Sequence, residues 1–515
     1  MSVNKPMQAI TFLILLAVVG RAGSGQDYTP SPVAPRQAVN PVGEAPEHGK
    51  LSKQPFPALL AQFEKSTPSM LRFFEAVNAL LAASPDATFQ DLAADPTIQR
   101  LAAENGITHW GGPMIGCLGP REAKIWIRTL QPAKVEVMVT VAGSEKRFGP
   151  VESTAKSDLS AVVPLTGLIP GAAHPYRVLI NGKPAKVPEK ASIVTLPDES
   201  QPARTRIIFG SCFHRWGLGN VQQADTIRSR QPAALVFYGD IAGQDKGKHR
   251  GLARGDYIMR DSFSAWRKLA SSFPVYATWD DHDYLDNDLA GLPAGYMPED
   301  RLRTWEVFRN SWVNPSYGFG DERRGVFLRT RIGPCDVIML DTRFFREKGN
   351  FLGADQMKWL EEQLLDCKGP FILLSSGTMW SDYVTNGKDS WGVWDPQGRE
   401  RILGFIEKNR IPGVLLLSGD RHGARGFKIP RPSGFRFYEF EPASLGGRSG
   451  PEVTNPAWKD VQLFGYSLIY AFGEFTIDAT LKDPEVTFRL IREDGKILEQ
   501  IDLKRSQRTP PAVGM

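Results

Sequence analysis

The segment Val275-Tyr276-Ala277-Thr278-Trp279-Asp280-Asp281-His282-Asp283 joins a short apolar run to a group of charged side chains. The apolar run has the length and the β-branched and aromatic content of a buried strand. Three carboxyl groups and an imidazole follow directly at its carboxyl end. A carboxylate beside a buried strand is costly unless it is paired or holds a metal ion. The segment therefore predicts a strand that brings reactive or metal-binding groups to the edge of a sheet.

Other apolar runs of the chain end in the same way. A lone carboxylate at a strand end is commonly a helix cap or part of an ion pair. In open α/β sheets, however, ligands bind outside the carboxyl ends of the strands. Several acidic strand ends, two of them also carrying His, therefore predict a metal site. The further runs and the residues that follow them are 207–209 before Ser211 and Cys212, 235–238 before Asp240, 337–340 before Asp341 and Arg343, and 414–417 before Asp420 and His422.

The pattern around these runs predicts the fold class. After Pro197, apolar runs alternate with amphipathic helical stretches such as 355–367 and 399–410, which is typical of an α/β sheet covered on both faces. Residues 473–503 return to period two and predict a closing β-element on the same domain. We therefore expect one α/β domain over residues 204–505.

The part of the chain before Pro197 has a different spacing of apolar residues. Residues 55–105 carry apolar side chains at helical spacing and predict a small helical segment that serves packing. Residues 106–197 alternate with period two, and Leu165–Gly171 followed by Tyr176–Ile180 resembles the late strands of fibronectin type III-like sandwiches. We expect a β-sandwich domain there, with no chemistry of its own.

The N-terminus resembles a secretory signal. Lys5 precedes the apolar stretch 9–19, and small residues follow at Ala22-Gly23-Ser24. The stretch is shorter than the roughly 20 residues that span a bilayer. Residues 1–25 therefore predict a signal peptide and an exported protein, periplasmic or extracellular, and residues 26–54 a flexible leader. The alternative is a buried N-terminal helix. No later segment predicts a transmembrane span.

Composition excludes several classes. In 515 residues, 42% are hydrophobic, 23% are charged and the net charge is +5, so binding to nucleic acid or membranes by bulk charge is not expected. We find no nucleic-acid-binding module, phosphate-binding loop, dinucleotide fingerprint, Cys-x-x-Cys pair or Gly-x-Ser-x-Gly motif. Four cysteines in so long a chain are no disulfide scaffold, although one bridge remains possible in an exported protein. The sequence leaves the oligomeric state open.

The histidines limit the choice of metal. Of seven, only His282 and His422 lie in the acidic clusters. Of the other five, His48 and His249 have polar surroundings typical of the surface, and His109, His174 and His214 are expected in packing or loops rather than as ligands. His214 stays open as an alternative ligand because it lies close after Cys212. Many carboxylates and few imidazoles favour hard or trivalent cations over a pure zinc site.

The successive motifs resemble those of the alkaline phosphatase D (PhoD-like) metallophosphatases, in order and at the same strand ends. The resemblance covers about residues 106–503 and also includes the stretch Leu352–Leu360. The motifs are Gly210-Ser211-Cys212, Gly239-Asp240, Trp279-Asp280-Asp281-His282-Asp283, Leu340-Asp341-Thr342-Arg343 and Ser418-Gly419-Asp420-Arg421-His422. The implied architecture is an α/β/β/α sandwich of the metallophosphoesterase type, preceded by the fibronectin-like domain.

The resemblance also implies roles for individual residues. Asp240 would bridge two metal ions, and His282 would be the general acid that protonates the leaving group. The implied ions are Fe³⁺ and Ca²⁺. Cys212 would bind the ferric ion as a thiolate; the alternative is a small buried thiol. The implied metal ligands are Cys212, Asp240, Asp281, Asp420 and His422.

Two positions qualify this assignment. Many family members carry a Tyr ligand three residues after the Gly-Asp aspartate, and this chain has Gly243 there. Asp245 or water could fill that gap, so the identity of the metals stays open. Arg343 is a candidate to clamp the phosphate through its planar guanidinium. The alternative for Arg343 is a salt bridge to Asp341 or another neighbour.

The resulting hypothesis is hydrolysis of phosphate monoesters or diesters by a metal-activated hydroxide. Two alternatives remain: a related hydrolase on the same scaffold that acts on another ester, and an exported binding protein on a decayed phosphatase scaffold. Intact Asp281-His282 and Asp420-Arg421-His422 speak against decay, whereas Gly243 speaks for it.

Overall fold

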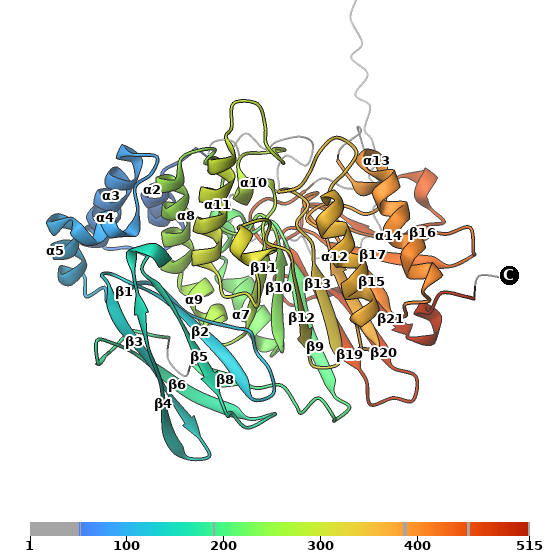
Figure 1. The fold of residues 1–515 in the computed structure, drawn as a ribbon, viewed down its shortest axis with the longest axis horizontal. Helices are drawn as coiled ribbons and strands as arrows, with labels where there is room; N and C mark the ends of the chain where they lie inside the picture. The colour runs from blue at the N-terminus through green and yellow to red at the C-terminus, as the bar shows by residue number, and fades with distance from the viewer. Residues whose placement is uncertain (1–50, 52, 189–190, 385–388, 451–453, 513–515) are drawn as a thin grey trace, which may run out of the picture.

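The computed structural model describes residues 51, 53–188, 191–384, 389–450 and 454–512. A group of helices, a pair of small sheets and a large two-sheet unit follow one another along the chain (Figure 1). The signal peptide expected over residues 1–25 and nearly all of the leader expected over 26–54 lie outside the described residues.

Four helices precede the first strand: α2 (Phe56–Phe63), α3 (Pro68–Ala83), α4 (Phe89–Ala94) and α5 (Pro96–Glu104). Helix α3 begins at Pro68, and the Thr67 hydroxyl caps it by accepting a hydrogen bond from the amide of Met70. Its buried residues Phe73, Val77 and Leu81 recur every four positions and form one apolar face. The helices pack on α8 (Arg250–Ser262) of the large unit, to which α2 and α3 are joined by many contacts.

The described residues of the range 109–194 form two antiparallel sheets. The first has the order β1-β2-β5, with β1 (His109–Gly116), β2 (Glu122–Thr129) and β5 (Ser160–Thr166). The second has the order β4-β3-β6-β7, with β8 also paired to β6; its strands are β4 (Ser144–Ser153), β3 (Ala133–Val141), β6 (Ala173–Ile180), β7 (Lys183–Pro184) and β8 (Ser192–Val194). Side chains such as Ile127, Val137 and Val163 share one core. The likeness to a fibronectin type III domain stays a prediction.

The first large sheet begins with three parallel strands, β11 (Val275–Thr278), β10 (Ala234–Tyr238) and β9 (Arg204–Gly210). Antiparallel strands β19 (Ala471–Asp478), β20 (Glu485–Arg492) and β21 (Ile497–Lys504) extend the sheet beyond β9. The alternating C-terminal segment therefore completes the sheet whose parallel strands lead into Cys212, Asp240 and Asp280.

The second large sheet has the order β12-β13-β14-β15-β17-β16-β18. Its centre is parallel, from β13 (Cys335–Met339) through β14 (Phe371–Ser375) and β15 (Val414–Leu417) to β17 (Arg436–Pro442). Antiparallel strands flank this centre: β12 (Leu328–Ile332), β16 (Ala424–Pro430) and β18 (Gln462–Tyr466).

The two large sheets pack face to face, and helices cover their outer faces (Figure 1). Because successive strand residues point to opposite faces, Phe209 and Leu373 meet in the core between the sheets, whereas Ile208 and Leu374 pack on the helices. The predicted α/β class is confirmed. The covering helices are α7 (Val221–Ser229), α8 and α9 (Ser264–Ala270) on the first sheet, and α12 (Gly353–Asp366) and α14 (Pro396–Lys408) on the second.

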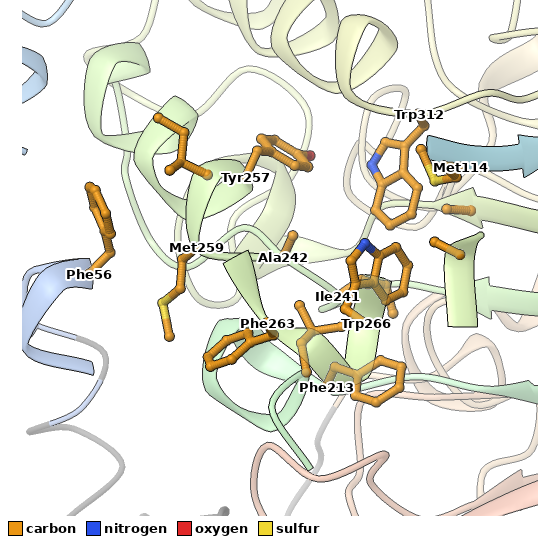
Figure 2. Close-up of a cluster of buried hydrophobic side chains, with 14 of the residues drawn as sticks. Phe56, Met114, Phe213, Ile241, Ala242, Tyr257, Met259, Phe263, Trp266 and Trp312 are labelled. Carbon is orange, nitrogen blue, oxygen red and sulfur yellow. The ribbon is translucent and has the colours of Figure 1, made fainter. Parts of the chain in front are cut away.

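A large buried apolar cluster anchors the loops that follow β9 and β10. Figure 2 shows Phe213, Ile241 and Ala242, which lie directly beside the candidate ligands Cys212 and Asp240, in this cluster. The rings of Trp266, from α9, and Trp312 meet edge to face at 5.8 Å in the same cluster. Because apolar neighbours fix the backbone on either side, the polar side chains between them are held in place.

Two further observations concern the described residues. None of their helices combines the length and apolar character needed to cross a bilayer. The four cysteines, all of which lie within the described ranges, form no disulfide.

Candidate functional site

The loops at the carboxyl ends of the strands bring most of the predicted ligands together. Asp240 is the common member of three groups whose ligand atoms all lie within 4.8 Å of one another. The groups are Cys212 with Asp240 and His422; His214 with Asp240 and His282; and Asp240 with Asp280, Asp281 and Asp420. All five predicted metal ligands and His282 are therefore in one place.

The backbone at this cluster is unusual. Cys212, His214, Asp240, Asp420 and His422 all have positive φ, between 43° and 73°. Residues with a Cβ atom rarely adopt this left-handed region, and each costs of order 1–3 kcal/mol where the surroundings impose it. Such strain concentrates at functional sites, because there the side-chain direction matters more than local backbone energy.

The carboxyl groups of the site lie close together, so bound positive charge would stabilise their ionised form. Burial raises the pKa of Asp240 well above its usual range, and the neighbouring Asp281 and Asp280 add to the rise while His282 opposes it. Oδ1 of Asp240 and Oδ1 of Asp281 are buried and have no hydrogen-bond partner among the described residues. Two such acceptors facing a cluster of further ligand atoms fit bound cations, which would keep the carboxylates charged.

Cys212 fits the same arrangement. Its Sγ atom lies 3.6 Å from Oδ2 of Asp240, and the side chain is buried. Burial, followed by the charge of Asp240, raises the pKa of Cys212 well above its usual range. Only a cation bound beside it would stabilise a thiolate there.

Arg343 is held in an ion pair inside the protein. Its guanidinium is fully buried and forms a double hydrogen bond with the carboxylate of Asp280 through Nε and Nη2. Nη2 also lies 3.7 Å from Asp281. Two of the three guanidinium nitrogens therefore serve an internal ion pair, which supports the alternative of a salt bridge to a neighbour. Despite burial, Arg343 and His282 hold the pKa of Asp281 below its usual range.

Two carboxylates near Arg343 hold neighbouring backbone and side chains in place. Asp341 does not join the cluster; it accepts hydrogen bonds from the backbone amides of Arg343, Phe344 and Val326 and so holds its own loop. Asp389 lies 2.7 Å from Arg346 and 3.2 Å from Arg421, whose guanidinium also bonds Asp420. The sequence analysis assigned no role to Asp280 or Asp389, because the partner of a buried arginine depends on tertiary packing.

His282 has a carboxylate partner of its own. Its Nδ1 donates a hydrogen bond to Oδ1 of Asp245 at 2.6 Å. Burial disfavours the charged ring, yet Asp281, Asp240 and Asp245 together raise the pKa of His282 well above its usual range. Asp245 therefore orients His282. It belongs to none of the three groups of ligand atoms, so the structure gives no support to Asp245 as a replacement for a missing metal ligand.

His214 is the histidine that the sequence analysis misplaced. It is not an ordinary packing or loop residue: its Nε2 lies 3.4 Å from Nε2 of His422, and its ring stacks on Trp216 at 5.2 Å. The available signal was its position four residues after the end of β9 and two residues beyond Cys212. Unlike His282 and His422, His214 has no carboxylate within two residues of it in the sequence.

Gly243 is required by close backbone packing. A Cβ atom there would lie 2.5 Å from Cα of Asp283, and the Asp283 carboxylate accepts hydrogen bonds from the amides of Gly243, Ala242 and Ile241. The Asp240 loop thus wraps around one carboxylate. No tyrosine can occupy position 243 without moving this backbone.

This packing gives a stability prediction. Gly243→Ala should lower the free energy of unfolding by about 1–3 kcal/mol, the usual cost of overpacking, as measured by denaturant unfolding of metal-free protein. Gly404→Ala is a matched control, because a Cβ atom on Gly404, which lies in helix α14, meets nothing within 4 Å. Equal stability of both variants would show that the loop has room for a side chain.

Comparisons with known proteins agree with this geometry. The sequence pattern of the PhoD-like phosphatases matches residues 207–488, and that of a domain of unknown function matches residues 109–198. No curated protein matches the chain.

Two solved structures share the fold. The structure of PhoD is 16% identical, with a TM-score of 0.65 over 78% of this chain and 91% of that one. The purple acid phosphatase PPD1 from yellow lupin (Lupinus luteus) seeds is 14% identical, with a TM-score of 0.58 over 76% and 74% of the two chains. Family and fold support phosphoester hydrolysis and do not favour the decayed binding protein. The family match covers more than half of the sequence, so this chain belongs to the PhoD-like phosphatase family.

Proposed function

We propose that the chain hydrolyses phosphate monoesters or diesters at the cluster around Asp240. The observation that carries the proposal is the convergence of thiol, imidazole and carboxylate groups on Asp240, whose buried Oδ1 has no hydrogen-bond partner among the described residues, in a member of a phosphatase family. A structural ion-pair network would instead pair this oxygen with arginine or a backbone amide.

Metal ions are the cofactors that this arrangement would hold. Asp240 offers Oδ2 beside Cys212 and an unpartnered Oδ1, so its two oxygens can serve two cations. When bound, such cations would activate water and offset the negative charge on the phosphoryl oxygens. The surrounding residues of the chain would keep these ligands charged and hold them in position.

The proposed role of His282 is to protonate the leaving oxygen. The raised pKa of its imidazole keeps a proton on the ring, and Asp245 fixes the orientation by accepting the hydrogen bond from Nδ1. Nε2 then carries the proton that can be donated. Asp245 is in this account a positioning residue.

The proposed role of His282 can be tested with substrates whose leaving groups differ in their need for a proton. His282→Asn should slow hydrolysis of an alkyl phosphate by about 10²–10⁴-fold, the usual contribution of general acid catalysis. Hydrolysis of nitrophenyl phosphate should fall much less, because nitrophenolate leaves without a proton. The comparison of kcat for both substrates, with elemental analysis of each protein, measures this effect. Loss of one metal equivalent from His282→Asn would instead make His282 a ligand.

Asp245→Asn should also slow hydrolysis of the alkyl phosphate more than hydrolysis of nitrophenyl phosphate, but by a smaller factor than His282→Asn. Without the carboxylate, the imidazole loses its anionic partner and its fixed orientation, so we expect kcat for the alkyl phosphate to fall by about 10–100-fold with KM little changed. A change in KM alone, measured on the same two substrates, would contradict the positioning role.

Parallel assays with monoesters and diesters then establish which class of phosphate ester the site prefers.

The N-terminal parts carry proposals of their own. We propose that residues 1–25 direct export to the periplasm or the extracellular space, that 26–54 act as a leader, that 55–105 serve packing, and that 106–197 are a fibronectin-like platform before the catalytic domain 204–505. Support comes from the signal-like sequence of the first segment and from the separate matches over 109–198 and 207–488. Mature protein that retains Met1 after expression in its own cell would contradict export by cleavage.

A further inference from the structure

A second cavity, of about 330 Å³, lies where the N-terminal helices, the small sheets and the large unit meet. Its walls come from α2 and α3, from the start of β1, and from α8 and α9, which lie together in this part of the molecule (Figure 1). None of its lining residues belongs to the groups of ligand atoms around Asp240. Small organic ligands occupy cavities of roughly 300–1,000 Å³. The cavity therefore has the size of a ligand site that is separate from the metal cluster.

Much of the cavity wall is apolar. Leu60, Phe73 and Ile258 line it and are almost completely buried by their own packing. The rings of Phe73 and Trp110, both in the wall, stack at 5.5 Å. Because these side chains are fixed by their neighbours, the wall keeps its shape without a ligand. Such a surface favours a ligand with an apolar body.

Arg267, from α9, is the charged group of the cavity that lacks a counterion. Its Nη2 donates a hydrogen bond to the carbonyl of Lys186 at 3.2 Å, and among the described residues Nε and Nη1 have no partner. Burial lowers the pKa of Arg267, although Asp261 and Glu64 oppose this effect from a distance. A guanidinium nevertheless keeps its charge in proteins. A half-buried charge without a counterion is unfavourable, and a bound anion would relieve it.

The two acidic residues of the lining already have other partners. Both oxygens of Asp261 accept hydrogen bonds from Arg260, at 2.8 and 3.0 Å. Oε2 of Glu64 accepts from the amide and the hydroxyl of Ser264, at 3.2 and 3.4 Å. Neither carboxylate forms an ion pair with Arg267. The cation is therefore available to a ligand.

The remaining charged groups of the lining agree with an anionic ligand. Lys65 and Lys186 are exposed and add positive charge around the cavity. His109 adds none at neutral pH, because burial and the charge of Arg267 lower its pKa to about 4. Its ring nitrogens already contact the Thr108 hydroxyl and the Gly112 carbonyl.

We propose that this cavity binds a small organic acid, with the apolar body of the ligand against Leu60 and Phe73 and its carboxylate at Arg267. A planar guanidinium with free N–H groups matches a carboxylate in both shape and charge. This inference does not depend on the proposed function, since binding is measured without any phosphate ester.

Two eight-carbon probes test the role of the charge. Octanoate and octan-1-ol are titrated separately into the purified full chain at neutral pH, and binding is measured by calorimetry. We expect one octanoate per chain, bound about 10–100-fold more tightly than octan-1-ol, as for a hydrogen bond to a charged group. Arg267→Met should remove this difference by weakening octanoate alone. Retained binding of octan-1-ol by the variant shows that its cavity is intact.

Lys268→Met is the matched control. Lys268 is the next residue of α9, is exposed and does not line the cavity, so its loss should leave the affinity for octanoate unchanged. Acetate tests the apolar wall: it lacks six methylene groups of octanoate and should bind at least about 100-fold more weakly. Octanoate that binds no better than octan-1-ol or acetate, or that binds Arg267→Met as tightly as the wild type, would overturn the proposal.

Discussion

Asp240→Asn should abolish both metal loading and phosphatase activity. Asp240 is the one residue shared by all three groups of ligand atoms, and an amide offers a single neutral oxygen in place of a bridging carboxylate. We expect the bound metal, measured by elemental analysis, to fall by more than half and kcat/KM for nitrophenyl phosphate to fall by more than about 100-fold, the upper range for residues that merely support a ligand.

Measurement of unfolding distinguishes the loss of metal and activity in Asp240→Asn from misfolding. Because burial and the neighbouring carboxyl groups raise the pKa of Asp240, the ionised side chain destabilises the metal-free fold. Metal-free Asp240→Asn should therefore unfold at the same or a higher denaturant concentration than the metal-free wild type. Asp336→Asn is the matched control, since Asp336 is a buried carboxylate in β13 that pairs with Arg329 outside the cluster. Full turnover by Asp240→Asn would refute the assigned site.

Arg343→Met should cause the largest loss of stability. Arg343 is the buried partner of Asp280, and removal of one member of a buried ion pair leaves an uncompensated charge that costs about 3–5 kcal/mol. The cost is larger in the absence of metal, because Asp280 and Asp281 would lose the positive charge that lies beside them. Denaturant unfolding with and without bound metal measures both values.

The same variant decides between the two interpretations of Arg343. If it only holds Asp280, metal-saturated Arg343→Met should be partly rescued in stability, and its KM for substrate should stay within about threefold of the wild type. If it clamps the phosphate, KM and the inhibition constant of inorganic phosphate should rise together while stability changes little. Arg329→Met provides a control at another buried aspartate, Asp336.

The sequence could predict the strands and the place where their ends meet. The runs before Cys212, Asp240, Asp280 and Asp420 are apolar on both faces because each sheet is covered by a second sheet and by helices, and that double burial is visible in composition. The ends of parallel strands share one edge of their sheet, so charged residues placed there converge regardless of their separation in the chain. The α/β class and the cluster of candidate ligands both follow from this pattern.

The sequence could not predict the pairing inside the cluster. Arg343 could reach several carboxylates, and only the tertiary structure shows that Asp280 is its partner. His214 begins the short helix α6 (His214–Gly217) with φ of 43°, so no periodic pattern indicates where its side chain points. Asp245 follows Asp240 as closely as a ligand would, yet its backbone, with φ of 52°, directs it to His282. Roles within a site depend on side-chain direction, and short irregular loops do not encode that direction in a repeating pattern.

The central claim is that acidic, imidazole and thiol groups from distant strand ends hold cations around Asp240. A crystal of the metal-loaded protein, recorded at the absorption edges of the bound metals, tests it most directly through anomalous difference density. The account predicts two peaks in contact with the Asp240 carboxylate, one beside Cys212 and His422 and one beside Asp281 and Asp420. A fully loaded protein with its anomalous peaks elsewhere, and only water at Asp240, would contradict it.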